Sequence, residues 1–290
     1  MTYFEEEGYI NALKEIYHNN STKEGRNGNT LSTFGLHYKF NLETGFPLLT
    51  TKKMFFKGIF EELLWFLNGE TNSKLLEDKK VNIWKGNSSK EFLEKTNLSY
   101  DEGECGPIYG WQWRRFNADY PKKDGGFDQL RYVIDEIKKG SRRAVLSGWN
   151  PLQLDKMALP PCHILYSFYR NGNQLSCAMF MRSNDTFLGL PYNIASTALL
   201  TTLIATALKL EPCDISISVC DAHIYEEHIE AVTEQIQRTP KTKPTIKIKQ
   251  PEKDFETTTE IIDWLTNVKL EDIVIENYEC YPKLTAPMIS

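Results

Sequence analysis

The sequence predicts a single α/β domain, and two observations carry that prediction. Segments with helical and with strand-like apolar spacing are intermixed along the chain, and no internal repeat or long linker separates them. The stretch from Thr186 to Leu208 carries no charged residue, and we expect it to form a helix buried at the centre of the domain. At 290 residues the chain is long enough to enclose a sizeable core.

The first half of the chain is predicted to be mainly helical. Apolar side chains recur at helical spacing in three segments, which are residues 4–17, 59–67 and 127–139. Asn68-Gly69 and Gly140 follow the second and third of these segments and are suitable helix stops. Between them, residues 30–42 have an extended pattern, and residues 85–104 are polar and charged, which predicts an insertion at the surface.

From residue 143 onward the pattern favours strands. Six segments are strand candidates: residues 143–149, 163–169, 175–181, 214–219, 245–249 and 273–278. Asn171-Gly172-Asn173 joins the second and third of them and is a strong hairpin signal. Residues 221–237 return to a helical pattern.

Composition excludes several classes of function. A net charge of -5 and a pI near 5.7 argue against a general nucleic-acid binder. The six scattered cysteines and the acidic N-terminus, which lacks a signal-peptide pattern, predict a cytoplasmic protein with reduced thiols. Residues 186–208 could span a bilayer by length, but Pro191, Asn193 and the lack of flanking cationic anchors argue against membrane insertion.

Two short segments carry the most chemical information. Cys162 follows two prolines at the start of a predicted strand, and Arg182, Asp185 and Asn193 come shortly before and within the uncharged segment. A thiolate can act as a nucleophile, a cation can lower its pKa, and an amide can recognise the edge of a heterocycle. A lone cysteine is more often a small buried apolar residue, but this setting favours a catalytic one.

These segments, Leu159–His163 and Arg182–Ser196, resemble the thymidylate synthase family, whose members methylate C5 of dUMP with 5,10-methylenetetrahydrofolate as co-substrate. The resemblance runs from about Tyr9 to about Pro287. It implies one thymidylate-synthase-like catalytic domain over residues 1–290, with a mixed twisted sheet packed with helices around the long central helix. It also implies dTMP and dihydrofolate as products, and a homodimer with shared active sites.

The resemblance further implies which residues bind dUMP. Five residues match positions that hold the phosphate: Arg26, Arg142, Arg143, Arg182 and Ser183. The Arg142-Arg143 pair is expected to reach this site from the partner subunit. Asn193 matches the asparagine that recognises N3 and O4 of uracil, a task that suits an amide because it donates and accepts at once. His223 and Tyr225 match the residues that hold the ribose 3′-hydroxyl.

The remaining positions concern catalysis and folate. By resemblance, Cys162 attacks C6 of the pyrimidine, Glu62 organises proton transfer, Tyr109 helps to remove the C5 proton and His163 orients the site. Three residues match folate-contacting positions: Trp84, Asn87 and Asp185. No metal is expected, because the spacing of Cys213, Cys220, His223 and His228 fits no common zinc motif.

The chain departs from the family pattern in several places. The loop from Arg26 to Thr30 is one residue shorter than usual, and the C-terminus reads Pro287-Met288-Ile289-Ser290. Four positions carry residues that are unusual for the family: Ser167, Met181, Thr197 and Cys220. Residues 181–185 also match a phage dCMP hydroxymethylase of the same superfamily. Two alternatives to thymidylate synthase therefore stay open. One is a dUMP hydroxymethylase, which uses water in place of hydride, and the other is a catalytically silent paralogue that only binds ligands.

Overall fold

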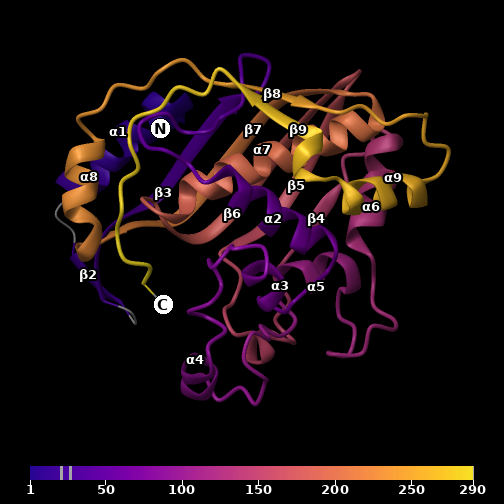
Figure 1. The fold of residues 1–290 in the computed structure, drawn as a ribbon, viewed down its shortest axis with the longest axis horizontal. Helices are drawn as coiled ribbons and strands as arrows, with labels where there is room; N and C mark the ends of the chain where they lie inside the picture. Colours follow the sequence, from indigo (N-terminus) through magenta and orange to yellow (C-terminus); the bar gives the residue numbers. More distant parts are fainter. Residues whose placement is uncertain (20–21, 26–27, 290) are drawn as a thin grey trace.

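A seven-stranded mixed sheet forms the framework of the molecule (Figure 1). In the computed structural model, which describes residues 1–19, 22–25 and 28–289, the strand order is β1-β3-β7-β6-β5-β4, and β2 pairs with β3. The strands are β1 (Thr2–Phe4), β2 (Thr22–Gly25), β3 (Gly28–Asn41), β4 (Val145–Ser147), β5 (His163–Asn171), β6 (Gln174–Asp185) and β7 (Glu211–Tyr225). The sheet is mixed because β6 and β7 pair in parallel, whereas β3 and β5 pair antiparallel with these two strands.

Helices cover one face of this sheet. The longest is α7 (Gly189–Leu208), which packs on β6 and β7 and lies beside α2 (Phe56–Leu67). The others are α1 (Glu5–His18), α3 (Lys74–Glu77), α4 (Lys90–Lys95), α5 (Tyr109–Arg115), α6 (Gln129–Lys138), α8 (Ile229–Gln235) and α9 (Thr258–Asn267), with 3₁₀ turns η1 (Leu154–Lys156), η2 (Glu226–His228) and η3 (Leu270–Asp272). β8 (Thr245–Ile248) and β9 (Ile273–Glu276) form a separate antiparallel pair.

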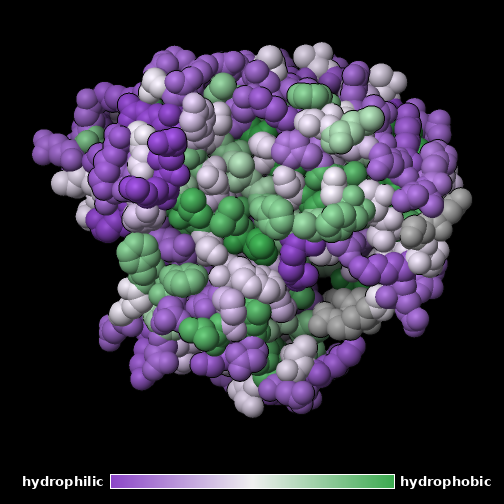
Figure 2. Space-filling model, turned by 180° about the vertical axis from the view of Figure 1, so that it is seen from behind, coloured by the Kyte–Doolittle hydropathy of each residue, from purple (hydrophilic) through white to green (hydrophobic). Residues whose placement is uncertain are grey.

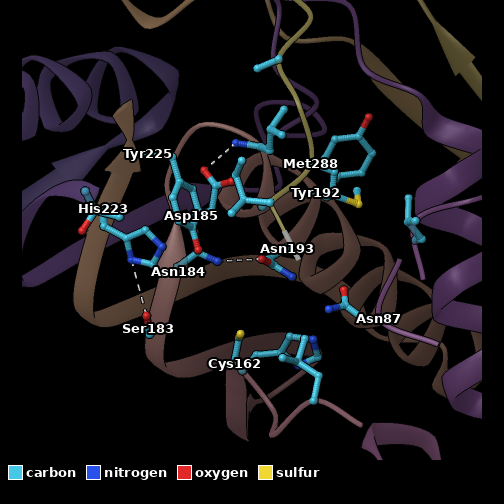
Figure 3. Close-up of a pocket in the computed structure, with 18 of the residues that line it drawn as sticks. Asn87, Cys162, Ser183, Asn184, Asp185, Tyr192, Asn193, His223, Tyr225 and Met288 are labelled. Atoms are coloured by element: carbon cyan, nitrogen blue, oxygen red, sulfur yellow. Dashed lines mark hydrogen bonds between the residues drawn. The ribbon is translucent and has the colours of Figure 1, made fainter. Parts of the chain in front are cut away.

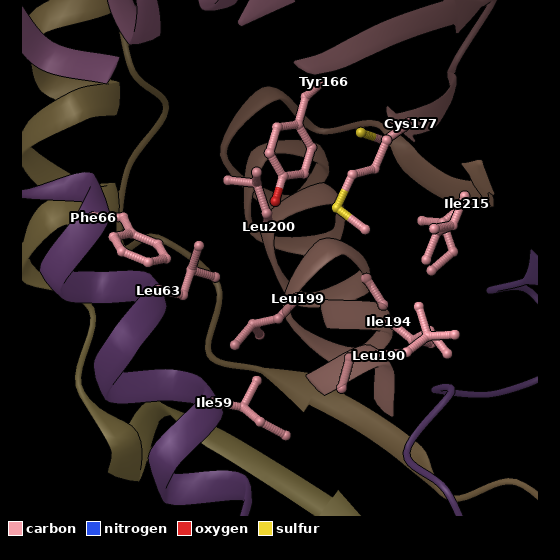
Figure 4. Packing of buried hydrophobic residues seen from close by; sticks show 14 of the residues in the cluster. Ile59, Leu63, Phe66, Tyr166, Cys177, Leu190, Ile194, Leu199, Leu200 and Ile215 are labelled. Carbon is pink, nitrogen blue, oxygen red and sulfur yellow. The ribbon is translucent and has the colours of Figure 1, made fainter. Parts of the chain in front are cut away.

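The core lies between α7 and the sheet (Figure 4). Alternate residues of β6, among them Cys177 and Met179, point to α7 and are buried, as the two-residue period of a strand requires. Ile194 and Leu199 of α7 are fully buried against them. Each such aliphatic side chain contributes roughly 1.5–3 kcal/mol through its burial, so the many buried side chains in this contact stabilise the fold.

The hydroxyl groups of α7 explain how an uncharged helix with many polar residues can be buried. Thr197, Thr201 and Thr202 each donate a hydrogen bond of 2.8 Å to the backbone carbonyl one turn earlier. Each hydroxyl donor is thereby satisfied within the helix, and burial leaves no unpaired group there. Among the described residues, no helix is long and apolar enough to cross a membrane.

Most of the predicted elements are confirmed. α1, α2, α6 and α7 lie where helical spacing placed them, and the hairpin between β5 and β6 turns at Gly172, whose φ of 60° suits glycine. The predicted α/β class with a central helix is also correct. The strand predicted over residues 143–149 is reduced to the three residues of β4.

Two predictions were wrong in detail. The helix expected from residue 221 begins only at Ile229, because β7 continues to Tyr225 and pairs with β3 and β6 along that stretch. Residues 85–104 are more than a surface insertion, since they hold α4, whose Phe92 and Leu93 are buried. α5 and α9 were not predicted. α5 has only seven residues, but α9 begins at a capping box of Thr257 and Glu260 and buries Ile261, Ile262 and Leu265 at helical spacing, so the sequence did carry a signal for it.

Candidate active site

A pocket of about 900 Å³ opens beside the ends of β6 and β7 (Figure 3). Its walls come from α2, the start of α5, the segment before β5, the first turn of α7 and the C-terminal segment. Twelve residues expected from the sequence line it: Glu62, Trp84, Asn87, Tyr109, Cys162, His163, Arg182, Ser183, Asp185, Asn193, His223 and Tyr225. Residues from positions 62 to 225 are thus gathered by the fold into one site.

Cys162 lies at the floor of this pocket, one residue before β5, and its thiol points into the cavity (Figure 3). Its backbone N–H donates a hydrogen bond of 2.7 Å to the hydroxyl of Tyr109. Tyr109 is the first residue of α5, reached through Gly106-Pro107-Ile108. Gly106 has φ of 74°, and a Cβ there would lie 2.1 Å from the carbonyl oxygen of Lys156, so only glycine allows this approach.

Arg182 holds the segment that carries the thiol. Its guanidinium donates to the carbonyl oxygens of Pro160 (2.7 Å) and Pro161 (2.8 Å), and it lies 3.9 Å from Cys162 Sγ. The guanidinium lowers the pKa of the thiol, but burial outweighs it, so the net pKa of Cys162 is raised.

Glu62 extends from α2 into the opposite side of the pocket. Burial raises the pKa of its carboxyl to about 7, and the hydrogen bond from Trp84 Nε1, at 2.8 Å, opposes this shift. A carboxyl with this pKa can give and take a proton near neutrality. Its neighbour Glu61 is also buried, but it forms an ion pair of 2.6 Å with Lys79 and does not line the pocket.

His163 is buried beside Cys162 and stacks on the ring of Tyr109, with centroids 4.2 Å apart. Its Nδ1 lies 3.0 Å from the hydroxyl of Tyr166. Burial lowers the pKa of this imidazole to about 3 and raises the pKa of the Tyr166 hydroxyl. Both groups are therefore neutral at physiological pH, and the pair fixes the orientation of the imidazole.

Asn193 faces the cavity from the first turns of α7 (Figure 3). Its Oδ1 accepts a hydrogen bond of 3.0 Å from Nδ2 of Asn184. This contact leaves the Asn193 amino group directed away from Asn184. Asn184 is buried, and its own Oδ1 has no hydrogen-bond partner among the described residues.

Polar groups gather at the far end of the pocket, near β2. His223 Nδ1 lies 3.5 Å from Ser183 Oγ and 3.4 Å from the carboxylate of Asp221. The other carboxylate oxygen of Asp221 lies 2.5 Å from Lys23 Nζ. The contact with His223, together with Lys23, lowers the pKa of Asp221 to about 2. Tyr225 packs edge-on against His223.

Asp185 and the apolar residues of the pocket mouth form its upper wall. Asp185 Oδ1 accepts from the backbone N–H groups of Phe187 (3.0 Å) and Leu188 (2.9 Å), which turns the chain from β6 toward α7. Tyr192 and Met288 lie close together near Asn87 in Figure 3 and give this part of the site its apolar surface. Trp84 is buried against Trp65 and also lines the cavity, so it is both a core residue and a pocket residue.

Two expected phosphate ligands do not line this pocket of the same chain, and a third is not among the described residues. Arg142 and Arg143 are exposed in the connection between α6 and β4 and do not line it. Arg26 lies outside the described residues, as does Asn27 of the shortened loop to which it belongs. No group of three or more His, Cys, Asp and Glu side chains suited to a metal ion occurs in the described ranges.

Sequence reasoning missed four residues that the structure places at the site: Lys23, Tyr166, Asn184 and Asp221. Asn184 and Asp221 are close in sequence to residues that were singled out, and their strand positions could have indicated them. Tyr166 is three residues after His163, but β5 has a register irregularity there, so simple alternation would not place the two side chains together.

Comparisons with known proteins agree with this geometry. The family model described as "Thymidylate synthase" matches residues 7–290. The chain is 42% identical to a thymidylate synthase of Herpesvirus ateles over 98% of this chain and 97% of that protein. It is also similar to bifunctional dihydrofolate reductase-thymidylate synthases, with 48% identity for the Zea mays protein and 45% for the Leishmania amazonensis protein. The match spans only 50% and 55% of the length of these bifunctional relatives.

Proposed function

Because the chain belongs to the thymidylate synthase family, we propose that it converts dUMP and 5,10-methylenetetrahydrofolate into dTMP and dihydrofolate. The observation that carries this proposal is the position of Cys162 at the floor of the pocket, held by Tyr109 and Arg182 and facing the amide of Asn193. This arrangement suits a nucleophile that attacks a pyrimidine whose edge an amide recognises.

We assign the roles of the nucleotide-binding residues from their places in the pocket. The Cys162 sulfur would form a bond to C6 of uracil, which makes C5 nucleophilic. Asn193 would donate to O4 through its amino group. Ser183 and His223, at the polar end, would bind the phosphate and the ribose, together with Tyr225.

The upper wall of the pocket fits the folate. Methylenetetrahydrofolate supplies a one-carbon unit and a hydride when it is bound. The indole of Trp84 offers a stacking surface, and Asn87 and the Asp185 carboxylate offer polar partners for the pterin ring. Tyr192 and Met288 would exclude water from the reacting carbon, which favours reduction over hydration.

Two groups beside the thiol are suited to proton transfer. Glu62, with a pKa of about 7, would relay protons to and from the pyrimidine. The hydroxyl of Tyr109, 2.7 Å from the Cys162 backbone nitrogen, is placed to assist removal of the C5 proton. Because His163 is neutral, its role would be to orient polar groups in the site rather than to supply a charge.

The direct test is covalent trapping of the nucleotide. Cys162→Ser should abolish turnover and the covalent adduct with 5-fluoro-dUMP and methylenetetrahydrofolate, detected by mass spectrometry of the intact protein. Cys213→Ser is the matched control and should form the adduct like the wild type, since Cys213 does not line the pocket. An adduct in the Cys162→Ser variant would refute the assignment.

The names of the relatives favour methylation over hydroxymethylation, because the viral protein matched along 97% of its length is a thymidylate synthase. The two reactions differ in their folate product. A reaction that consumes dUMP with a rise in near-ultraviolet absorbance has made dihydrofolate. If dUMP is consumed without that rise, and 5-hydroxymethyl-dUMP is found by mass spectrometry, the protein is a hydroxymethylase.

We further propose that the enzyme is a homodimer with shared active sites. The sheet face opposite α7 carries exposed apolar residues, including Leu165, Tyr169 and Phe180, and Figure 2 shows hydrophobic residues gathered near the centre of that side. A dimer through this face would bury them. Arg142 and Arg143 are exposed and would be free to reach the phosphate end of the partner's pocket.

Mixing two inactive variants tests this sharing. Cys162→Ser chains combined with Arg143→Ala chains should regain partial activity, because a heterodimer has one site with neither change. If mixing restores no activity in chains that are shown to exchange subunits, the sites are not shared.

We also propose that the protein works in the cytoplasm, since all six cysteines are unpaired in the structure. Cell fractionation tests this localisation.

A further inference from the structure

The C-terminal segment lies across the pocket but is held by very little. Leu284, Thr285, Ala286, Met288 and Ile289 line the cavity, yet most of residues 282–289 are partly or fully exposed. Within the part of the chain that the structure describes, residues 283–289 take part in a single hydrogen bond. It joins the carbonyl oxygen of Pro287 to Nε2 of His228, at 2.8 Å.

His228 is fully buried and faces a second acceptor. Its Nδ1 lies 3.6 Å from Oδ1 of Asp185, the residue proposed to contact the pterin. A carbonyl and a carboxylate both accept hydrogen bonds, whereas a neutral imidazole has only one N–H. Both contacts can be favourable only when the ring carries two protons and a positive charge.

We propose that His228, as an imidazolium, is a positioning residue that ties the C-terminal segment to Asp185 and holds that segment over the folate-binding part of the pocket. The rings of Phe187 and Tyr225 pack against it, with centroids 5.5 and 5.4 Å away, and these aromatic faces suit a cation. The assignment of folate to this wall rests on the proposed function, but the attachment of the segment does not.

The charged and titratable groups around the ring favour its charged form. Burial lowers the pKa of His228, but Asp185, the Pro287 carbonyl and Glu227 outweigh burial, so the pKa is raised. Lys52 faces Asp185 from the other side, with Nζ 3.8 Å from the centre of the Phe187 ring, and burial lowers its pKa to about 7. Tyr9 of α1 also lies near Asp185, and the Asp185 carboxylate helps to raise the pKa of the Tyr9 hydroxyl.

The test measures the segment itself and does not require catalysis. Limited proteolysis within residues 283–289, corrected for the activity of the protease at each pH, should show protection below the pKa of His228 and loss of protection above it. His228→Phe keeps the aromatic contacts but removes the hydrogen bond to Pro287 and the charge contact with Asp185. Protection should therefore fall roughly tenfold or more below the pKa of His228 and match that of the wild type above it. His18→Gln, at the exposed end of α1, is the matched control and should behave like the wild type.

Two outcomes would overturn the proposal. One is equal protection of the segment in His228→Phe and wild type below the pKa of His228. The other is a pH dependence that persists unchanged in His228→Phe, because the titrating group would then be Lys52. If the variant folds poorly, His228→Gln retains one donor and should give intermediate protection.

Kinetics give a second readout. In His228→Phe the KM for methylenetetrahydrofolate should rise roughly tenfold, while the KM for dUMP stays within about twofold. Removing residues 287–290 should have a similar effect, and the two changes together should be no worse than one, because both remove the same contact. If the two increases in KM multiply in the double variant, His228 acts through a contact other than the one with Pro287. Failure of the enzyme to use dUMP at all would contradict the proposed function without affecting the proteolysis result.

Discussion

Nδ2 of Asn184 lies 3.0 Å from Oδ1 of Asn193 at the edge of the pocket. The Asn184 amino group donates to the Asn193 side-chain oxygen, so the Asn193 amino group is left to donate to a ligand. An isolated asparagine could present either end to a heterocycle, and in the observed orientation the Asn184 amide holds Asn193 with its amino group toward the pocket. Selection of uracil over cytosine would then depend on a pair of amides rather than on Asn193 alone.

We expect Asn184→Asp to shift preference from dUMP toward dCMP. A carboxylate only accepts hydrogen bonds, so Asn193 should turn its amino group toward residue 184 and its oxygen toward the nucleotide. That oxygen matches the amino group of cytosine and opposes O4 of uracil. The ratio of kcat/KM for dCMP to that for dUMP should rise about tenfold or more, measured with both substrates in separate assays.

Asn184→Leu is the control for this prediction. It removes the orienting hydrogen bond without adding an acceptor, so dUMP turnover should fall roughly fivefold to tenfold with no gain for dCMP. An unchanged substrate ratio in Asn184→Asp would mean that the orientation of Asn193 is set by other contacts.

Glu62 should make folding stability depend on pH. Its pKa is about 7 in the folded protein, against the ordinary value of 4.5 that we take for the unfolded chain, so between these values the folded state binds more protons than the unfolded state. The stability that Glu62 contributes is therefore complete below 4.5 and is lost as the pH rises through 7. The slope approaches about -1.4 kcal/mol per pH unit at most, and solvent in the pocket will reduce it.

Comparison of Glu62→Gln with the wild type isolates this slope. The free energy of unfolding, measured by urea denaturation from pH 5 to pH 8, should fall less with pH in the variant than in the wild type. The comparison is needed because His163, whose pKa is lowered to about 3, contributes the opposite slope below its usual value of 6.5. Parallel curves for the two proteins would show that Glu62 is not protonated near neutrality.

The hydroxyl of Tyr166 should matter because it satisfies a buried ring nitrogen. Tyr166→Phe removes the partner of His163 Nδ1, and an unsatisfied buried polar group costs about 1–3 kcal/mol in the free energy of unfolding. Tyr17→Phe is the control, because the half-buried Tyr17 lies on α1, away from this pair and from the proposed dimer face, and it should change stability by less than about 0.5 kcal/mol. Equal losses in the two variants, by urea denaturation, would contradict this role.

The sequence indicated which residues lie in the candidate site, but it did not indicate the hydrogen bonds that hold these residues in position. The uncharged helix and the Gly172 hairpin follow from local patterns, and the Pro-Pro-Cys-His motif identified Cys162. The Asn184–Asn193 and His163–Tyr166 pairs depend on the register between strands and on the turn into α7, which a single sequence does not specify. The balance between burial and Arg182 at Cys162 likewise depends on the depth of the pocket, which only the fold determines.

α7 covers one face of the sheet, and Phe180 tests the proposal that a partner chain binds the other face. Phe180 lies on β6 and is 38% exposed on the face that the proposed dimer would bury. Phe180→Asp places a charge in that apolar contact, so the protein should become monomeric in sedimentation velocity runs at working concentration. Activity should fall when the dimer is lost, because the partner's Arg142 and Arg143 would no longer reach the phosphate.

Val274→Asp is the control. It lies at an exposed position of β9, outside this sheet, and should leave both the dimer and the activity intact. A Phe180→Asp variant that is monomeric and fully active would show that each chain carries a complete site.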